Sequence, residues 1–108
     1  MNTLNSLMEK CETVSSRYAH NNSIDRTQDW FLFKLQEELG ELTKAYINAK
    51  GLGRKTDKSD AQLKTELAQE LADVLGHVLL FAKHNQIDPD EAVNAKWLKY
   101  LGESNPQS

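Results

Sequence analysis

The amino-acid sequence predicts an all-α protein whose four helices form a bundle. Apolar residues recur at spacings of three and four along most of the 108 residues, which is the period of a helix with one buried face. Both prolines lie late, at Pro89 and Pro106, and no stretch alternates apolar and polar residues as a half-buried strand does. We therefore expect a single helical domain over residues 1–102, followed by a disordered tail over 103–108.

The first two helices are expected over about residues 3–19 and 25–50. The polar stretch 20–23 ends the first helix, whose apolar stripe consists of Leu4, Leu7, Met8, Cys11, Val14 and Tyr18. Gly51 ends the second helix, whose stripe consists of Phe31, Leu35, Leu39, Leu42, Tyr46 and Ala49. A loop with two glycines and several cations follows.

The third helix is expected over residues 60–84 and the fourth from residue 89 to about residue 101. Ser59 and Gln62 have the spacing of a capping box, and Asn85 can take the left-handed conformation that ends a helix. The sequence DPDE at 88–91 has the N-cap aspartate, the first-position proline and the third-position acid of a helix start. The stripe of the third helix consists of Leu63, Leu67, Leu71, Val74, Val78 and Phe81.

The composition excludes several classes of protein. The single cysteine, Cys11, rules out an intramolecular disulfide and a thiolate metal cluster. A net charge of −3 favours neither a nucleic-acid nor an anionic membrane partner, and no apolar run approaches the ~20 residues needed to span a bilayer. The polar N-terminus is unlike a secretory signal. We expect a cytoplasmic protein that binds neither nucleic acid nor a membrane.

The same short acidic phrase occurs in the second and in the third expected helix. ELGEL at 38–42 matches ELADV at 70–74 position for position, so each helix carries two carboxylates three residues apart on one face. Both pairs lie beside an apolar stripe, where like charges repel and lose hydration. Mg²⁺ would offset that cost, because it prefers oxygen ligands and retains several waters. Solvated glutamate-rich faces, or salt bridges to Lys34, Lys44 or Lys64, are the alternative interpretations.

These phrases also carry a resemblance to a known family. EELGEL at 37–42, followed by ELADVL at 70–75, resembles the EExxE…ExxD signature of MazG-like nucleoside triphosphate pyrophosphohydrolases. The likeness extends to residue 100 and covers about two-thirds of the chain. It implies a MazG-type bundle completed by assembly into dimers or tetramers, and a requirement for Mg²⁺, with Mn²⁺ as an alternative ion. The metal ligands that it implies are Glu38, Glu41, Glu70 and Asp73.

The resemblance further implies a reaction, in which water attacks the α-phosphorus of an NTP or dNTP. The products are a nucleoside monophosphate and pyrophosphate, as in the cleansing of nucleotide pools. Glu37 or Glu41 is expected to accept the proton. An aromatic residue near the start of a core helix also has an ordinary packing role, and lysines also occupy solvated faces. The candidate substrate-binding residues, for which these ordinary roles are the alternative, are Trp30, Lys34, Arg54, Lys96 and Lys99.

Two other functions stay open on the sequence. The phosphoribosyl-ATP pyrophosphohydrolase of histidine biosynthesis shares the helical fold and the acidic pairs, and ADVLGH at 72–77 faintly resembles its ADLLYH string. Gly76 stands at the tyrosine position of that string, and the linker between the motifs is longer here. The other alternative is a non-enzymatic helical module whose acidic surface binds a basic partner.

The apolar stripes of the second and third helices predict self-association. They are widened by further leucines beyond what two long and two short helices would cover, namely Leu32, Leu75, Leu79 and Leu80. We expect a homodimer or a dimer of dimers.

Overall fold

A computed structural model describes residues 3–102, and all of its regular secondary structure is helical, which confirms the all-α class. The elements are α1 (Leu4–Asn21), α2 (Trp30–Ala49), α3 (Asp60–His84), α4 (Pro89–Lys96) and the short 3₁₀ helix η1 (Leu98–Tyr100). The tail expected to be disordered, 103–108, lies outside the described residues. No helix among those described is long and apolar enough to cross a membrane.

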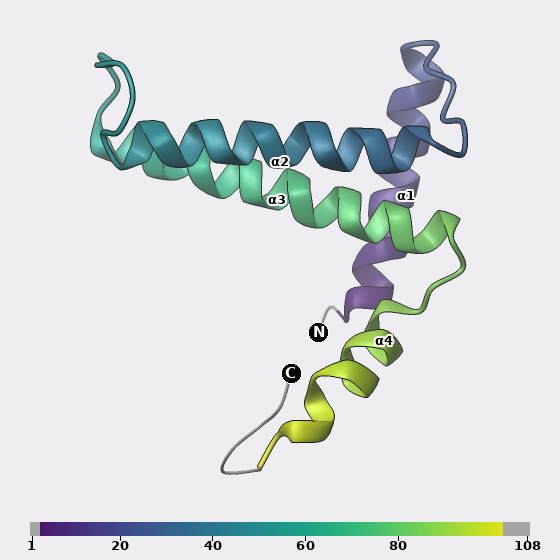
Figure 1. Cartoon of the computed structure of the whole chain (residues 1–108). Coiled ribbons are helices and arrows are strands. Elements are labelled where there is room, and N and C mark those ends of the chain that lie inside the picture. The colour runs from purple at the N-terminus through teal and green to yellow at the C-terminus, as the bar shows by residue number, and fades with distance from the viewer. Residues whose placement is uncertain (1–2, 103–108) are drawn as a thin grey trace.

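Two long helices form the body of the molecule. Figure 1 shows α2 and α3 side by side, joined at one end by the loop 50–59, with α1 crossing them near the opposite end. The short α4 lies below this body and packs against α1. The matched acidic phrases fall in the middle of α2 and α3, so the hairpin brings them together between the loop and α1.

Three of the predicted helix boundaries are confirmed by their caps. Ser59 Oγ accepts a hydrogen bond from the amide of Gln62 at 3.2 Å, and the Gln62 side chain accepts one from the Ser59 amide at 2.8 Å. Asp88 accepts from the amide of Glu91 at 3.0 Å, so α4 begins at the expected proline. Gly51, with φ of 68°, stops α2 in a conformation that glycine adopts without strain.

Two boundary predictions, and one prediction of backbone conformation, are wrong. The second helix begins at Trp30 rather than at residue 25, because Arg26 turns back to pair with Glu12 on α1. The third helix ends at His84 as predicted, but the residue with positive φ after it is Gln86, at 54°, whereas Asn85 has φ of −114°. The fourth helix ends at Lys96, short of residue 101, and the segment beyond it exposes most of its apolar side chains, which leaves little packing to extend it.

The core of the chain is small and lies mainly where α1 crosses α3. Met8, Leu79 and Ala82 are buried together there, with Leu4, Leu7 and Cys11 packed against them. The far end of the expected first stripe is not core, because Val14 and Tyr18 are 67% and 62% exposed. The expected stripes of α2 and α3 also leave large side chains half exposed, including Leu39, Tyr46, Leu71 and Val78. In a single chain, the apolar surface therefore exceeds what the helices cover.

Candidate metal site and adjoining cleft

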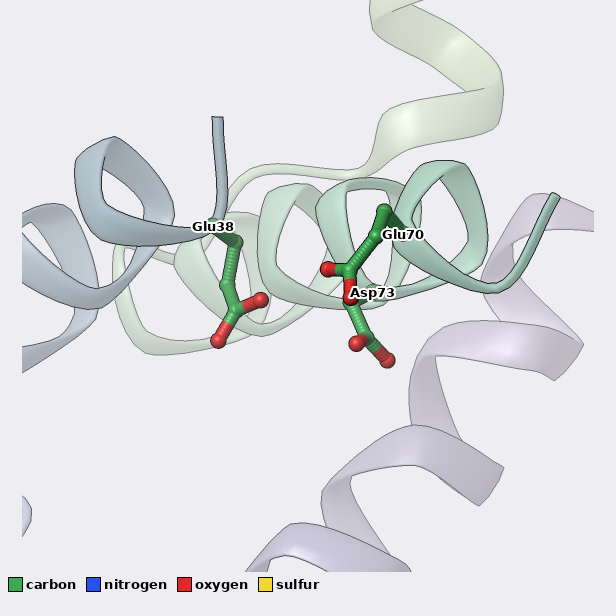
Figure 2. A group of neighbouring side chains, drawn as sticks. All are labelled: Glu38, Glu70 and Asp73. Atoms are coloured by element: carbon green, nitrogen blue, oxygen red, sulfur yellow. The ribbon is translucent and has the colours of Figure 1, made fainter. Parts of the chain in front are cut away.

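Three of the four predicted metal ligands come together at the middle of the hairpin. Glu38 of α2 and Glu70 and Asp73 of α3 each offer a carboxylate oxygen, and these oxygens lie within 4.8 Å of one another. Figure 2 shows the three side chains extending to the same side of the two helices. We call this group the carboxylate trio. The matched spacing predicted it, because two adjacent helices with acids at i and i+3 present them on facing edges.

The fourth predicted ligand, Glu41, lies one turn further along α2. It is exposed and is not among the carboxylates that approach within 4.8 Å. Its negative charge nevertheless contributes to raising the pKa of both Glu38 and Glu70. Glu41 is therefore close enough to act electrostatically on the carboxylate trio, and its role as a ligand stays a prediction.

The carboxylate trio is an electrostatically unfavourable arrangement by itself. Partial loss of hydration, followed by repulsion from Asp73, raises the pKa of Glu38. The pKa of Glu70 is raised by the same two causes in the same order, with Glu38 adding to the repulsion. A divalent cation relieves both effects, and three carboxylate oxygens at this separation are the hard donors that Mg²⁺ takes. The donor set therefore fits a magnesium ion.

Lys34 partly compensates this negative charge. Its Nζ donates a hydrogen bond to Glu37 Oε1 at 2.9 Å and lies 3.8 Å from Glu38 Oε1. This hydrogen bond raises the pKa of Lys34 and lowers that of Glu37. One of the salt bridges considered in the sequence is thus present at the edge of the carboxylate trio. Lys44 and Lys64 take part in none of the ion pairs found within residues 3–102.

A cleft of about 680 Å³ opens beside the carboxylate trio, between α1 and the hairpin. Glu38 and Asp73 line this cleft, and so do Lys34 and Trp30. Its volume is within the roughly 300–1,000 Å³ typical of small-molecule sites. Of the predicted substrate-binding residues, Lys34 therefore lies beside the candidate metal site, and Trp30 lines the cleft that adjoins it.

The remaining predicted substrate-binding residues lie elsewhere in the chain. Arg54 is in the exposed loop beyond α2, which begins about 17 Å from Glu38 along the helix axis. Lys96 ends α4 and Lys99 lies in η1, where its Nζ is 5.1 Å from the centre of the Tyr100 ring. The main contacts of α4 are with α1 and η1, away from the carboxylate trio. Within one chain, the structure does not bring these three cations to the site.

Trp30 and His77 both line the cleft. The Trp30 ring packs edge-on against Phe31, with ring centres 5.1 Å apart, and its centre is 6.0 Å from that of His77. Burial, followed by the charge of Lys34, lowers the pKa of His77 and favours its neutral form. Its Nδ1 is buried and has no hydrogen-bond partner within the described part of the chain. Trp30 therefore serves in packing and also faces the cleft.

Sequence reasoning missed the contribution of α1 to this cleft. Val14 and Tyr18, interpreted as part of a core stripe, line it instead, and so does Cys11. Helical spacing cannot separate a residue that packs from one that lines a cleft, because both lie on the inner face. The available signal was Gly76, a glycine in mid-helix that leaves room opposite Cys11.

A polar network that the sequence did not reveal fixes the segment before Trp30. The Arg26 guanidinium donates to both Glu12 oxygens, at 2.8 and 3.0 Å, and to Ser15 Oγ at 3.1 Å. His84 Nε2 lies 2.9 Å from Glu12 Oε1, and its ring stacks on Phe31 with centres 3.8 Å apart. The hydrogen bond from Arg26 is the largest cause of the lowered pKa of Glu12. This network joins α1, the loop 22–29 and the end of α3.

The fold and the site together define a class of protein: an all-α hairpin with oxygen ligands for a hard dication beside a small-molecule cleft. A family model described as phosphoribosyl-ATP pyrophosphohydrolase matches residues 2–95, and the chain belongs to this family. The family lies in the same all-α NTP pyrophosphatase superfamily as the MazG-like enzymes and is generally Mg²⁺-dependent. No curated protein and no solved structure matches the chain.

Membership supports a nucleotide pyrophosphohydrolase activity, in which a phosphoanhydride is hydrolysed. The family that matches is the one that the sequence placed second, through the resemblance of residues 72–77. The more specific MazG-like assignment stays a hypothesis.

Proposed function

We propose that the chain hydrolyses the bond between the α- and β-phosphates of nucleoside or deoxynucleoside triphosphates, releasing a monophosphate and pyrophosphate. The observation that carries the proposal is the carboxylate trio, whose oxygens lie within 4.8 Å of one another at the edge of a 680 Å³ cleft. A triphosphate is strongly anionic and would be repelled by bare carboxylates. A divalent metal ion on the carboxylate trio reverses the sign of the local charge and so favours its binding.

The residues around the site would take three roles in this reaction: metal ligand, general base and phosphate contact. Mg²⁺, when bound, supplies positive charge that polarises the phosphate and acidifies the attacking water. Glu38, Glu70 and Asp73 would hold the ion, with Glu41 as a fourth ligand or as the base that accepts the proton. Glu37 is the other candidate base, although its hydrogen bond with Lys34 lowers its pKa and weakens it in that role. Lys34, which lines the cleft, would contact the phosphates.

The test is hydrolysis of a panel of NTPs and dNTPs with Mg²⁺ in water enriched in oxygen-18. Attack at the α-phosphorus puts the label in the nucleoside monophosphate and releases unlabelled pyrophosphate. Orthophosphate with a nucleoside diphosphate would show attack at the γ-phosphorus and contradict the proposal. If no nucleotide is hydrolysed and Mg²⁺ gives no thermal stabilisation, the non-enzymatic acidic module is favoured instead.

A second candidate substrate is phosphoribosyl-ATP, and the observation that favours it is the family match over residues 2–95. The same bond of the triphosphate would be cleaved by the same residues. Comparing kcat/KM for phosphoribosyl-ATP with that for ATP separates the two, because each proposal requires its own substrate to be preferred. This chain has Gly76 where the ADLLYH string of the phosphoribosyl-ATP enzyme has tyrosine, and its loop 50–59 makes the linker between the acidic motifs longer than in that enzyme. Both differences favour nucleoside triphosphates as the substrate.

A further inference from the structure

Gly76 lies in the interior of α3, where glycine needs an explanation. Glycine weakens a helix relative to alanine, because it loses more conformational freedom on folding. Its backbone here is not in the left-handed region, so no special conformation requires it. A Cβ built on Gly76 would meet only Cys11 Sγ, at 4.0 Å, which is an ordinary contact. Neither the backbone nor close helix packing therefore demands a glycine at this position.

What Gly76 does in the structure is leave the cleft open. It lines the cleft on α3, opposite α1, and contributes no side chain to it. Asp73 of the carboxylate trio lies one helical turn before Gly76, and both face the same cleft. A ligand whose phosphates face the carboxylates therefore has the space at Gly76 within reach of its other end.

Two aromatic side chains line the same cleft. Trp30 is fixed on the hairpin side by its edge-on packing against Phe31. Tyr18 lies on the α1 side and is 62% exposed, so its ring is not committed to the core. Aromatic walls of this kind stack nucleobases with little dependence on which base is present, which leaves discrimination to the size and shape of the space.

We propose that the cleft between α1 and the hairpin holds the nucleobase of the substrate, and that Gly76 is the specificity-determining residue that sets how large a base is admitted. This inference rests on the proposed function for the identity of the ligand. It adds the orientation of the nucleotide, with its phosphates at the carboxylate trio and its base between Trp30 and Tyr18.

The experiment uses Trp30 as its own reporter. The chain has two tryptophans, and Trp97, which is 61% exposed in the segment after α4, is replaced in a Trp97→Phe background. Fluorescence is titrated with AMP, GMP, CMP, UMP and dTMP in the presence of Mg²⁺. Ribose 5-phosphate is titrated in parallel as the matched probe that lacks a base. Saturable quenching by the nucleotides and none by ribose 5-phosphate is expected.

Gly76→Ala and Gly76→Leu in that background test the size limit. Alanine adds one carbon at ordinary contact distance, whereas leucine fills the space, so Kd should rise in the order parent, Gly76→Ala, Gly76→Leu. The rise for Gly76→Leu should be at least about tenfold, and larger for purine than for pyrimidine nucleotides. If Gly76→Leu does not fold, Tyr18→Ala takes its place. Its exposed ring can be removed with little loss of packing, and a rise of about tenfold is expected from lost stacking.

The outcomes separate this inference from the proposed function. Equal quenching by nucleotides and ribose 5-phosphate, or an unchanged Kd in Tyr18→Ala, would overturn the nucleobase assignment even if pyrophosphate release persists. An unchanged Kd in a folded Gly76→Leu variant would overturn the role assigned to Gly76. Base-dependent quenching that Gly76→Leu weakens would sustain the assignment even if no nucleotide is hydrolysed, in which case the proposed function fails alone.

Discussion

The carboxylate trio is a cluster of like charges that the folded chain holds together at a cost. The pKa values of Glu38 and Glu70 are raised by lost hydration and mutual repulsion, so the ionised forms of both destabilise the fold. The partial compensation by Lys34 is directed mainly at Glu37 and only more distantly at Glu38, at 2.9 and 3.8 Å. The ionisation of these carboxylates therefore affects both the stability of the fold and the binding of a metal ion, and makes both depend on pH.

Glu70→Gln keeps the shape of the side chain and removes one negative charge from the carboxylate trio. Pyrophosphohydrolysis should fall by orders of magnitude, because a charged ligand is lost. The metal-free protein should become more stable, and Mg²⁺ should raise its melting temperature less than it raises that of the parent. Melting curves in EDTA and in MgCl₂ measure both effects. Equal Mg²⁺-induced shifts in parent and variant would exclude Glu70 as a metal ligand.

The same substitution has a predictable pH dependence in EDTA. A carboxyl whose pKa is raised by folding destabilises the fold at neutral pH, and this penalty is relieved as the pH falls through the raised value. The stabilisation by Glu70→Gln should therefore be larger at neutral pH than below pH 4.5, the ordinary pKa of the group. Urea denaturation at the two pH values measures the difference. A gain that is the same at both values would show that repulsion is not the cause.

Glu12→Gln is a control for which the opposite change in stability is expected. Its pKa is lowered, chiefly by the hydrogen bond from Arg26, so its ionised form stabilises the fold. That contribution is present at neutral pH and is lost as the pH falls through the lowered value. Glu12→Gln should destabilise the protein at neutral pH, and by less under more acidic conditions.

At the scale of the element, the segment 22–29 shows a tertiary contact overriding a local helical pattern. The sequence predicted a helix from residue 25, yet the chain stays irregular until Trp30, because Arg26 pairs with Glu12 and Ser15 on α1. The network thereby fixes where α2 begins and hence where the Trp30 ring lies. Arg26 is a positioning residue for the cleft and touches no part of the carboxylate trio.

Arg26→Ala should lower the free energy of unfolding by about 1–3 kcal/mol, because it breaks partly buried charged hydrogen bonds and leaves Glu12 without its main partner. Arg17→Ala is the matched control. Arg17 is exposed on the same helix as Glu12, and its loss should change stability by less than about 0.5 kcal/mol. Urea denaturation compares the two variants. Similar small losses in both would show that the network does not stabilise the segment.

The helix boundaries could be predicted where capping residues close in sequence determine them. The capping box at Ser59 and the Asp88–Pro89 start each lie within four residues, and both formed as expected. The carboxylate trio was also predictable, because two matched phrases must face each other once α2 and α3 pair. The cleft was not, since it depends on how α1 crosses the hairpin, and no spacing within one helix encodes that crossing.

At the scale of the whole molecule, a single chain leaves much apolar surface uncovered. On α2 three of the exposed apolar side chains repeat every seven residues, and on α3 the exposed apolar side chains follow spacings of four and three, which aligns each of these sets along one face of its helix. These residues are Leu32, Leu39 and Tyr46 on α2, and Leu71, Leu75 and Val78 on α3. We propose that a second copy of the chain covers them in a homodimer or a dimer of dimers, since a chain this small gains most from burying such faces on itself.

Light scattering at micromolar concentration should therefore report a dimer or tetramer. Leu75→Glu, which places a charge at a side chain that is 54% exposed, should shift the protein towards monomer. Leu52→Glu makes the same change at a side chain in the loop 50–59 that is 71% exposed, and should leave the assembly intact. A monomeric parent protein would contradict the proposal.

The attachment of α4 to the start of α1 has a consequence for the order of folding. Asp90 accepts hydrogen bonds from the amides of Leu4 and Asn5 at 3.1 and 3.2 Å, so a carboxylate from the end of the chain satisfies donors at its beginning. These partners are 86 and 85 residues apart, whereas α2 and α3 follow each other in the sequence and are separated only by the loop 50–59. Contacts of short sequence separation close first, because they cost the least chain entropy. The hairpin with its carboxylates therefore forms early. The contacts of α1 with the end of α3 and with α4, which complete the wall of the cleft, join residues far apart in the sequence and form later.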